Sequence, residues 1–96
     1  MNIVIICGKI VSEIDFKFIY DRYKNIKIEY EEKYKHTSIA KCKVKLLNNS
    51  IVEIYGYDEI ADYMYRNFKE NQIIALEGNL DSEMKIEVRS TYICII

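Results

Sequence analysis

Tryptophan and proline are absent from the 96-residue sequence, which also has only one histidine, three glycines and three cysteines. So few histidines and cysteines leave little material for a metal site or for a Ser-His-Asp triad. The patterns GxGxxG, GxxxxGK(S/T) and HExxH do not occur, so neither a phosphate-binding loop nor a zinc-protease site is indicated. His36, in the polar stretch Glu31–Ser38, is interpreted as a solvated side chain. The sequence therefore predicts a protein that is not an enzyme and needs no metal or cofactor.

Long hydrophobic segments are absent as well. The longest uncharged apolar run is the six residues Ile3–Gly8, which is too short to cross a bilayer. The start of the sequence does not resemble a signal peptide, and no CxxC pair occurs. Cys7, Cys42 and Cys94 each lie in an apolar, strand-like run, so we expect reduced thiols in the core of a cytoplasmic protein without membrane contact.

Charge is small in total but unevenly distributed. The net charge of −1 does not by itself indicate a nucleic-acid partner. Residues 1–50 hold ten Lys and Arg against six Asp and Glu, whereas residues 51–96 hold four against nine. If the two halves occupy different faces, one side of the protein is basic and the other acidic.

Alternation of apolar and polar residues predicts a mostly β protein. Strands are expected at Asn2–Val11, Ile14–Tyr20, Ile26–Tyr30, Ser38–Leu47, Ile51–Tyr57, Gln72–Leu80 and Met84–Ile96. Gly8 is expected to mark a bulge or bend in the first strand. The tight turn Asn48-Asn49-Ser50 is expected to join two strands as a hairpin, since asparagine tolerates left-handed backbone angles.

One helix is predicted, from Asp58 to about Lys69. Asp58 is expected to cap its first turn, and Asn71 is expected to stop it. Its apolar stripe consists of Ile60, Ala61, Met64 and Phe68. A single helix between the third and fourth main strands is the order of the OB-fold. We therefore expect residues 1–96 to form one all-β domain with one helix, a five-stranded antiparallel OB-fold barrel.

The sequence resembles the bacterial single-stranded DNA-binding protein family over roughly its whole length. Asn2-Ile-Val-Ile-Ile-Cys-Gly8-Lys-Ile10 is similar to the family's first strand, and Thr37-Ser-Ile-Ala-Lys-Cys-Lys-Val44 to its second. Tyr55-Gly56-Tyr57 resembles the family's F-G-K, and Glu77-Gly78-Asn79-Leu80 resembles its E-G-x-L. The resemblance implies binding of single-stranded DNA and assembly as a homodimer or homotetramer. A short primosomal OB-fold protein is a second model.

A basic row beside an aromatic pair fits such binding, because phosphates need cations and bases stack on aromatic rings. Lys41, Lys43 and Lys45 alternate along one predicted strand, and Tyr55 and Tyr57 lie on the next. The resemblance adds three further residues at positions that match the family's DNA path. The candidate nucleic-acid-binding residues are Lys9, Lys17, Phe18, Lys41, Lys43, Lys45, Tyr55 and Tyr57.

Departures from the family keep alternatives open. The family's stacking tryptophans have no counterpart, and Asn49 stands where one would fall. No acidic, apolar tip of the kind that recruits replication proteins follows Ile96, so recruitment by such a tail is not expected. The lysine row is also typical of a solvated strand face. A protein-interaction or oligomerisation module that has lost DNA binding therefore remains an alternative, RNA is a further candidate ligand, and the Tyr- and Lys-rich segment 20–36 is either a DNA-gripping arm or a product of compositional drift.

Overall fold

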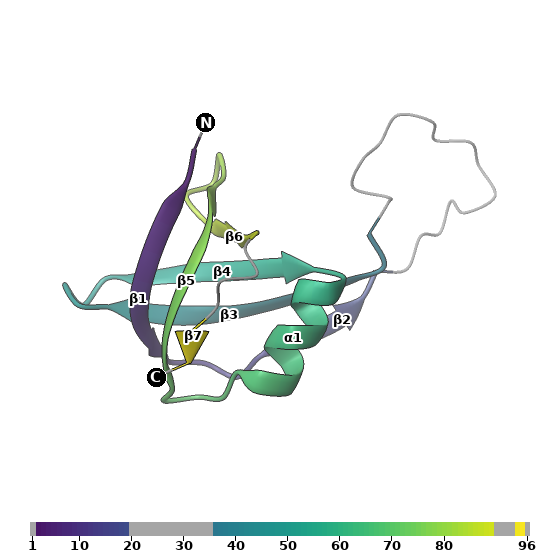
Figure 1. The fold of residues 1–96 in the computed structure, drawn as a ribbon, viewed down its shortest axis with the longest axis horizontal. Coiled ribbons are helices and arrows are strands. Elements are labelled where there is room, and N and C mark those ends of the chain that lie inside the picture. Colours follow the sequence, from purple (N-terminus) through teal and green to yellow (C-terminus); the bar gives the residue numbers. More distant parts are fainter. Residues whose placement is uncertain (1, 20–35, 90–93, 96) are drawn as a thin grey trace.

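The computed structural model describes residues 2–19, 36–89 and 94–95. It contains a set of strands and one helix, which packs beside them (Figure 1). The elements are β1 (Val4–Ile10), β2 (Asp15–Phe18), β3 (Ser38–Leu46), β4 (Ile51–Tyr57), α1 (Glu59–Asn67), β5 (Ile73–Leu80), β6 (Ile86–Val88) and β7 (Cys94–Ile95). The predicted strand Ile26–Tyr30 and nearly all of the segment 20–36 lie outside the described residues.

The strands close into a barrel. β1 pairs with β3, β3 with β4, β4 with β6, β6 with β5, and β5 returns to β1. This is the predicted OB-fold order, with α1 between the third and fourth strands of the barrel, and it confirms the predicted fold class. One detail differs from the expectation of antiparallel pairing throughout, because β4 and β6 run parallel. The helix and β5 carry the chain back across the barrel, so β6 enters it in the direction of β4.

The core consists of inward-facing aliphatic side chains from the barrel strands and the apolar stripe of α1. The side chains that are almost fully buried are Ile10, Val44, Ile54, Met64, Ile74, Leu76 and Val88. Ala61 and Met64 of the helix and Phe68, which directly follows it, are buried against this cluster, as their spacing predicts. The outward residues of β3 and β4 are therefore displayed on the barrel surface, where the candidate site lies.

Glycine at position 8 allows β1 and β3 to approach closely. A Cβ atom there would lie 2.5 Å from the carbonyl oxygen of Lys45 and 2.7 Å from Cγ1 of Val44. The hairpin prediction is confirmed, since Asn49 adopts a left-handed φ of 68° between β3 and β4. At Gly8 the structure therefore shows a close approach of β1 and β3 and no bulge.

Two boundary predictions are wrong. The helix ends at Asn67 and not at Lys69, because Phe68 is already extended; Asn71, with a φ of 75°, belongs to the turn before β5. The expected long strand Met84–Ile96 is not continuous. Met84 lies in a turn with a φ of 64°, and only Ile86–Val88 and Cys94–Ile95 are described as strands. Both errors arise where the chain must turn sharply to close the barrel.

The predictions for Asp58 and the cysteines also need correction. Asp58 occupies the N-cap position, but its side chain makes no capping hydrogen bond, because it is bonded to residues that precede β3. Cys42 is buried as expected, and burial raises the pKa of its thiol to about 12. Cys7 is exposed on the outer face of β1 and is not a core thiol. Cys94 is described only in its backbone.

Candidate nucleic-acid interface

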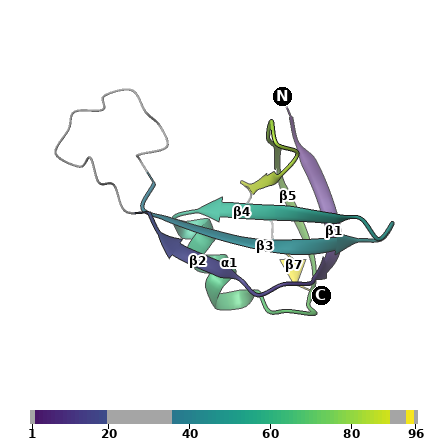
Figure 2. The ribbon, with the colours of Figure 1, turned by 180° about the vertical axis from the view of Figure 1, so that it is seen from behind.

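Strand pairing aligns the candidate residues in rows across β2, β3 and β4, which lie side by side in Figure 2. Lys41 of β3 is directly opposite Tyr55 of β4, and Ile39 is opposite Tyr57. On the other side of β3, Lys17 is opposite Ile39. Residues directly opposite each other share a face of the sheet. The register therefore places Lys17, Lys41, Tyr55 and Tyr57 on one surface, which we call the outer β3–β4 face.

The lysines of β3 extend the outer β3–β4 face along the strand toward β1. Lys43 and Lys45 are exposed, and Lys45 is directly opposite Lys9 of β1. Like charges at directly opposed positions repel each other. An anion lying between Lys9 and Lys45 would relieve this repulsion, so the pair suits a phosphate group.

The two tyrosines are held in a fixed arrangement. Their rings meet edge to face, with centroids 5.8 Å apart and planes at 81°. The hydroxyl of Tyr55 donates a hydrogen bond of 2.8 Å to Oδ2 of Asp81. Desolvation, reinforced by this hydrogen bond, raises the pKa of Tyr55 above its ordinary value, and desolvation likewise raises that of Tyr57. Both rings are therefore neutral, oriented surfaces on which a base can stack.

Phe18 and Lys17 occupy opposite sides of β2. Lys17 lies on the outer β3–β4 face and approaches Asp15, with Nζ 3.6 Å from Oδ2. Phe18 is 79% exposed and packs edge to face on Phe16, which in turn contacts Tyr65 of α1. Strand alternation turns these phenylalanines toward the helix side. Phe18 is thus the one candidate that the structure does not bring to the outer β3–β4 face.

Acidic groups line the far side of the tyrosine pair, next to β6 and the β5–β6 turn. Glu53 lies opposite Lys43 in register but forms its ion pair with Lys85, at 3.0 Å. Oδ1 of Asp81 accepts hydrogen bonds from the backbone N–H groups of Glu83 and Lys85, and these bonds lower the pKa of Asp81. A shallow hollow of about 180 Å³ between these groups includes Tyr55, Tyr57 and Lys41. The face is therefore basic along β3 and acidic beyond β4.

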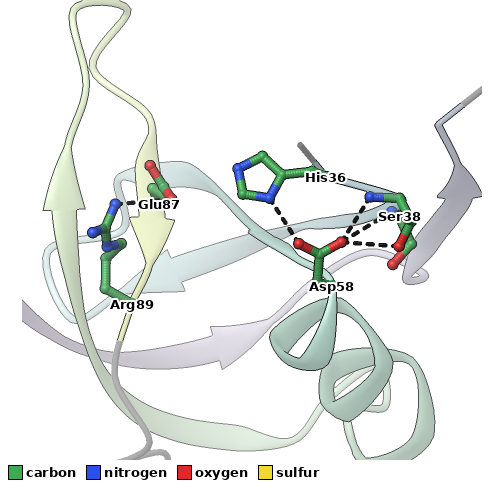
Figure 3. A network of polar contacts seen from close by, with 6 residues as sticks. His36, Ser38, Asp58, Glu87 and Arg89 are labelled. Carbon is green, nitrogen blue, oxygen red and sulfur yellow. Dashed lines mark hydrogen bonds and ion pairs between the residues drawn. The ribbon is translucent and has the colours of Figure 1, made fainter. Parts of the chain in front are cut away.

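His36 is part of an organised cluster at the end of β4 (Figure 3). Its ring stacks on Tyr57 with centroids 4.1 Å apart and planes at 10°, and its Nδ1 lies 2.7 Å from Oδ2 of Asp58. The other carboxylate oxygen of Asp58 accepts hydrogen bonds from Thr37 and from the backbone N–H of Ser38. These bonds lower the pKa of Asp58 to about 2, the His36 contact being the largest cause. The interpretation of His36 as a solvated side chain is wrong.

A cavity of about 330 Å³ lies beside this cluster, between the end of β6 and the start of α1. Tyr57 and His36 border it on one side, and Glu87 and Arg89 on the other. Arg89 Nη1 lies 3.3 Å from Oε2 of Glu87. Figure 3 shows these two side chains across from the His36 ring.

Several of these residues escape sequence reasoning. Asp81 and Lys85 reach the tyrosines only when β4 pairs with β6, which brings the β5–β6 turn to β4, and His36 reaches Tyr57 through the register of β3 and β4. Glu87 is different. It alternates with the buried Ile86 and Val88, so the pattern of β6 alone indicates that its side chain faces outward.

Within 2–19, 36–89 and 94–95, no group of three His, Cys, Asp or Glu side chains is placed to hold a metal ion. No helix in this part of the chain is long and apolar enough to span a membrane.

The strand order and the position of the helix define a small OB-fold barrel. No family model matches the chain, and no curated protein matches it in sequence. Solved structures do match. The SSB domain of a Synechococcus sp. protein superposes with a TM-score of 0.69 at 20% identity, covering 97% of this chain and 93% of that one.

Two further structures extend the comparison. A small single-stranded DNA-binding protein from Streptomyces coelicolor gives a TM-score of 0.66 at 8% identity, with coverage of 98% and 91%. The wild-type single-stranded DNA binding protein from Thermus aquaticus gives 0.71 at 12% identity, and this chain corresponds to 40% of its length. At these identities the likeness concerns the fold. It confirms that the chain has the OB-fold of structures in the family that the sequence resembles.

Proposed function

We propose that the protein binds single-stranded DNA without sequence specificity through the outer β3–β4 face. It acts in this proposal by binding and not by catalysis, in the cytoplasm, as an accessory of replication, repair or recombination. The observation that carries the proposal is the register of β3 and β4, which sets Lys41 directly opposite Tyr55 in a sheet whose outer side also displays Lys43 and Lys45.

In this arrangement the DNA backbone follows the lysines of β3 and the bases turn toward β4. Phosphates contacted by Lys41, Lys43 and Lys45 release condensed counterions, which makes the affinity depend on salt. Bases stack on Tyr55 and Tyr57, and such stacking contributes about 1–3 kcal/mol per base without requiring a particular sequence. Lys9, opposite Lys45, and Lys17, opposite Ile39, extend the track at its two ends.

A small footprint follows from the same residues. The sequence has no tryptophan, and the β3–β4 hairpin turns through only a few residues around Asn49. Within the part of the chain that the structure describes, the stacking surface of the outer β3–β4 face consists of the tyrosine pair and the groups beside it. We expect a binding site of a few nucleotides per barrel and weaker binding than an interface with several tryptophans provides.

Assembly of two or more copies is part of the proposal. The outer face of β1 displays Ile3, 54% exposed, and Ile5, 79% exposed, with Cys7 next to them. β1 pairs with β5 from Val4 to Lys9 but with β3 only from Gly8 to Ile10. Its first half thus offers both apolar side chains and an open strand edge, which a second copy of β1 can cover. A homodimer or homotetramer would bury this surface.

One observation favours a second function. The acidic groups on β4 and beyond it, including Glu53 and Asp81, repel a phosphate backbone, which suits an OB-fold module that binds proteins and has lost DNA binding. RNA is a further candidate ligand, since nothing in the outer β3–β4 face excludes a 2′-hydroxyl. Direct binding measurements distinguish these candidates.

The test of the DNA proposal is Lys43→Glu, compared with Lys69→Glu as a matched control. Lys43 is exposed in the row on β3, whereas Lys69 is exposed in the turn after α1. Anisotropy titration of a labelled thymidine oligonucleotide at several salt concentrations gives the affinity and its salt dependence. Lys43→Glu should weaken binding and reduce the slope of log affinity against log salt by about one. Equal effects of the two substitutions would show that the lysine row does not contact the phosphates.

A further inference from the structure

We propose that the cavity between the end of β6 and the start of α1 holds one nucleotide of the bound strand, and that Glu87 there selects bases that carry an exocyclic amino group. Adenine, cytosine and guanine carry such a group and thymine does not. The inference rests on the proposed binding of single-stranded DNA and adds to it a preference among bases.

The size of the cavity fits a single nucleotide. Its volume is about 330 Å³, at the lower end of the range of about 300–1,000 Å³ found for small-molecule sites. Ile60 and Val88 contribute apolar lining, and Tyr57 and His36 contribute aromatic lining. A flat heterocycle can therefore lie between the apolar and the aromatic groups of the cavity. A hydrated metal ion or a free phosphate would gain nothing from such a lining.

On the aromatic side of the cavity, the rings of His36 and Tyr57 are stacked on each other. His36 covers one face of the Tyr57 ring at a centroid distance of 4.1 Å, with the rings nearly parallel. Asp58 holds the histidine from the side through the 2.7 Å contact to Nδ1. A base that enters the cavity can extend this column of parallel rings, and stacking of this kind accepts any base.

The charges of the cavity favour a base over an isolated ion. Each carboxylate has a cationic or hydrogen-bonding partner, Asp58 with His36 and Glu87 with Arg89, so neither sign of charge dominates. The contact from Arg89 engages one oxygen of Glu87, Oε2. The side chain of Glu87 is 25% exposed and that of Arg89 is 61% exposed. Arg89 can therefore turn to a phosphate at little cost, while the carboxylate of Glu87 stays in place.

The order of the strands sets the direction of the nucleotide. Lys41 on β3 is opposite Tyr55 on β4, and Tyr55 is opposite Glu87 on β6. A lysine, an aromatic ring and a carboxylate thus follow one another across two strand spacings, about 10 Å in total. A nucleotide with its phosphate at the lysine row and its base over β4 presents the edge of the base to Glu87.

The chemistry of that edge decides the preference. A carboxylate accepts hydrogen bonds from the amino groups of cytosine, adenine and guanine. Thymine presents the carbonyl oxygen O4 where cytosine has its amino group, and the carboxylate repels this oxygen, which leaves N3–H as the only donor on that edge of thymine. Glu87 therefore gives the site a preference that stacking alone does not.

The experiment compares homopolymers of deoxycytidine and thymidine of equal length, because both are pyrimidines of similar size. Dissociation constants are measured by anisotropy at pH 7.5 and a single salt concentration for the unmodified protein, Glu87→Gln and Glu70→Gln. Glu70 is exposed after α1 and does not line the cavity, so Glu70→Gln removes the same charge elsewhere. The quantity of interest is the ratio of the affinity for deoxycytidine to that for thymidine.

We expect this ratio to fall about fivefold or more in Glu87→Gln, since a good base-edge contact discriminates by at least about this factor, and to remain unchanged in Glu70→Gln. Glu87→Ala should act in the same direction, and circular dichroism checks that each variant is folded. If both homopolymers bind and Glu87→Gln leaves the ratio unchanged, the base preference is wrong while the proposed function stands. If neither homopolymer binds the unmodified protein, the proposed function fails and the preference fails with it.

Discussion

Asp58 links the segment before β3 to the end of β4. It receives hydrogen bonds from the backbone N–H and hydroxyl of Thr37, at 2.7 and 3.0 Å, and contacts His36 at 2.7 Å. The sequence suggests a helix cap at this position, because Asp before an apolar-periodic segment usually caps it. The observed partners are 20 to 22 residues away along the chain and reach Asp58 through the β3–β4 hairpin, whose register places Ile39 opposite Tyr57, so the residues next to Asp58 in the sequence do not reveal them.

The Asp58→Asn substitution should lower the free energy of unfolding by about 1 kcal/mol at pH 6, since it weakens several hydrogen bonds to a charged acceptor. This loss of stability is at the low end of the range for hydrogen bonds to charged groups, because the Asp58 side chain is 38% exposed and solvent screens its interactions. Urea unfolding followed by circular dichroism measures the difference. Asp62→Asn, which removes only the exposed pair with Arg66, is the control and should cost a few tenths of a kcal/mol.

The same substitution should change the response to acid. The pKa of Asp58 is lowered from 3.8 to about 2 in the folded protein, so its stabilisation is complete above about pH 4 and is lost as the pH falls through about 2. The gap in stability between the unmodified protein and Asp58→Asn should therefore close over this interval. A gap that persists below pH 2 would show that the carboxylate is not the source of the stabilisation.

At the scale of elements, β1 passes from one barrel partner to the other at Gly8. This residue is opposite Ile74 of β5 and opposite Leu46 of β3. Its missing side chain permits the close approach of the β3 backbone at Lys45. The stability of the barrel closure therefore depends on glycine at this position.

The Gly8→Ala substitution should destabilise the protein by about 1–3 kcal/mol, because a Cβ atom would collide with backbone that cannot move without disturbing the β1–β3 pairing. Thermal unfolding measures the effect. Glu13→Ala, at an exposed position after β1, is the control and should leave the unfolding temperature nearly unchanged. A neutral Gly8→Ala would mean that the strands are less closely packed than the structure indicates.

Strands with a strong alternation of apolar and polar residues could be predicted from the sequence. Features that depend on how the barrel closes could not. Ala40, Cys42 and Val44 are buried and the lysines between them face outward, as period two requires. The alternating pattern of Met84–Ile96 predicts one long strand, but only Ile86–Val88 and Cys94–Ile95 are described as strands. Met84 has a left-handed backbone there, which the pattern of apolar residues does not reveal.

The candidate site was partly predictable for the same reason. Lys41, Lys43 and Lys45 alternate within one strand, and the short hairpin at Asn49 fixes their register against Tyr55 and Tyr57. Phe18 was chosen by resemblance, but alternation along β2 places it on the side of α1. Asp81 lies in the β5–β6 turn, which reaches β4 only when β4 pairs with β6, so its proximity to the tyrosines depends on topology.

At the scale of the whole molecule, the exposed apolar face of β1 is the surface through which we propose that copies of the chain assemble. The Ile5→Lys substitution should shift the protein toward monomer, because it places a charge at the centre of the surface that the proposal buries. Ile5 lies opposite Glu77 of β5, so the new lysine can pair with it and the barrel should remain folded. Sedimentation velocity measures the species present. Met84→Lys, at a position 69% exposed in the β5–β6 turn, should leave assembly unchanged.

An unmodified protein that sediments as a monomer at every concentration would contradict the assembly proposal. It would also mean that Ile3 and Ile5 are left uncovered by other copies of the chain. Equal shifts in Ile5→Lys and Met84→Lys would locate the contact away from β1.

The central claim is that the outer β3–β4 face binds single-stranded DNA, and one titration tests it most directly. Labelled thymidine oligonucleotide is titrated with the unmodified protein at two salt concentrations, with duplex DNA of equal length as the control. The account predicts binding that is selective for the single strand and weakens as salt rises. Absence of binding at low salt, or equal binding to the duplex, would contradict it and turn attention to protein partners of the barrel.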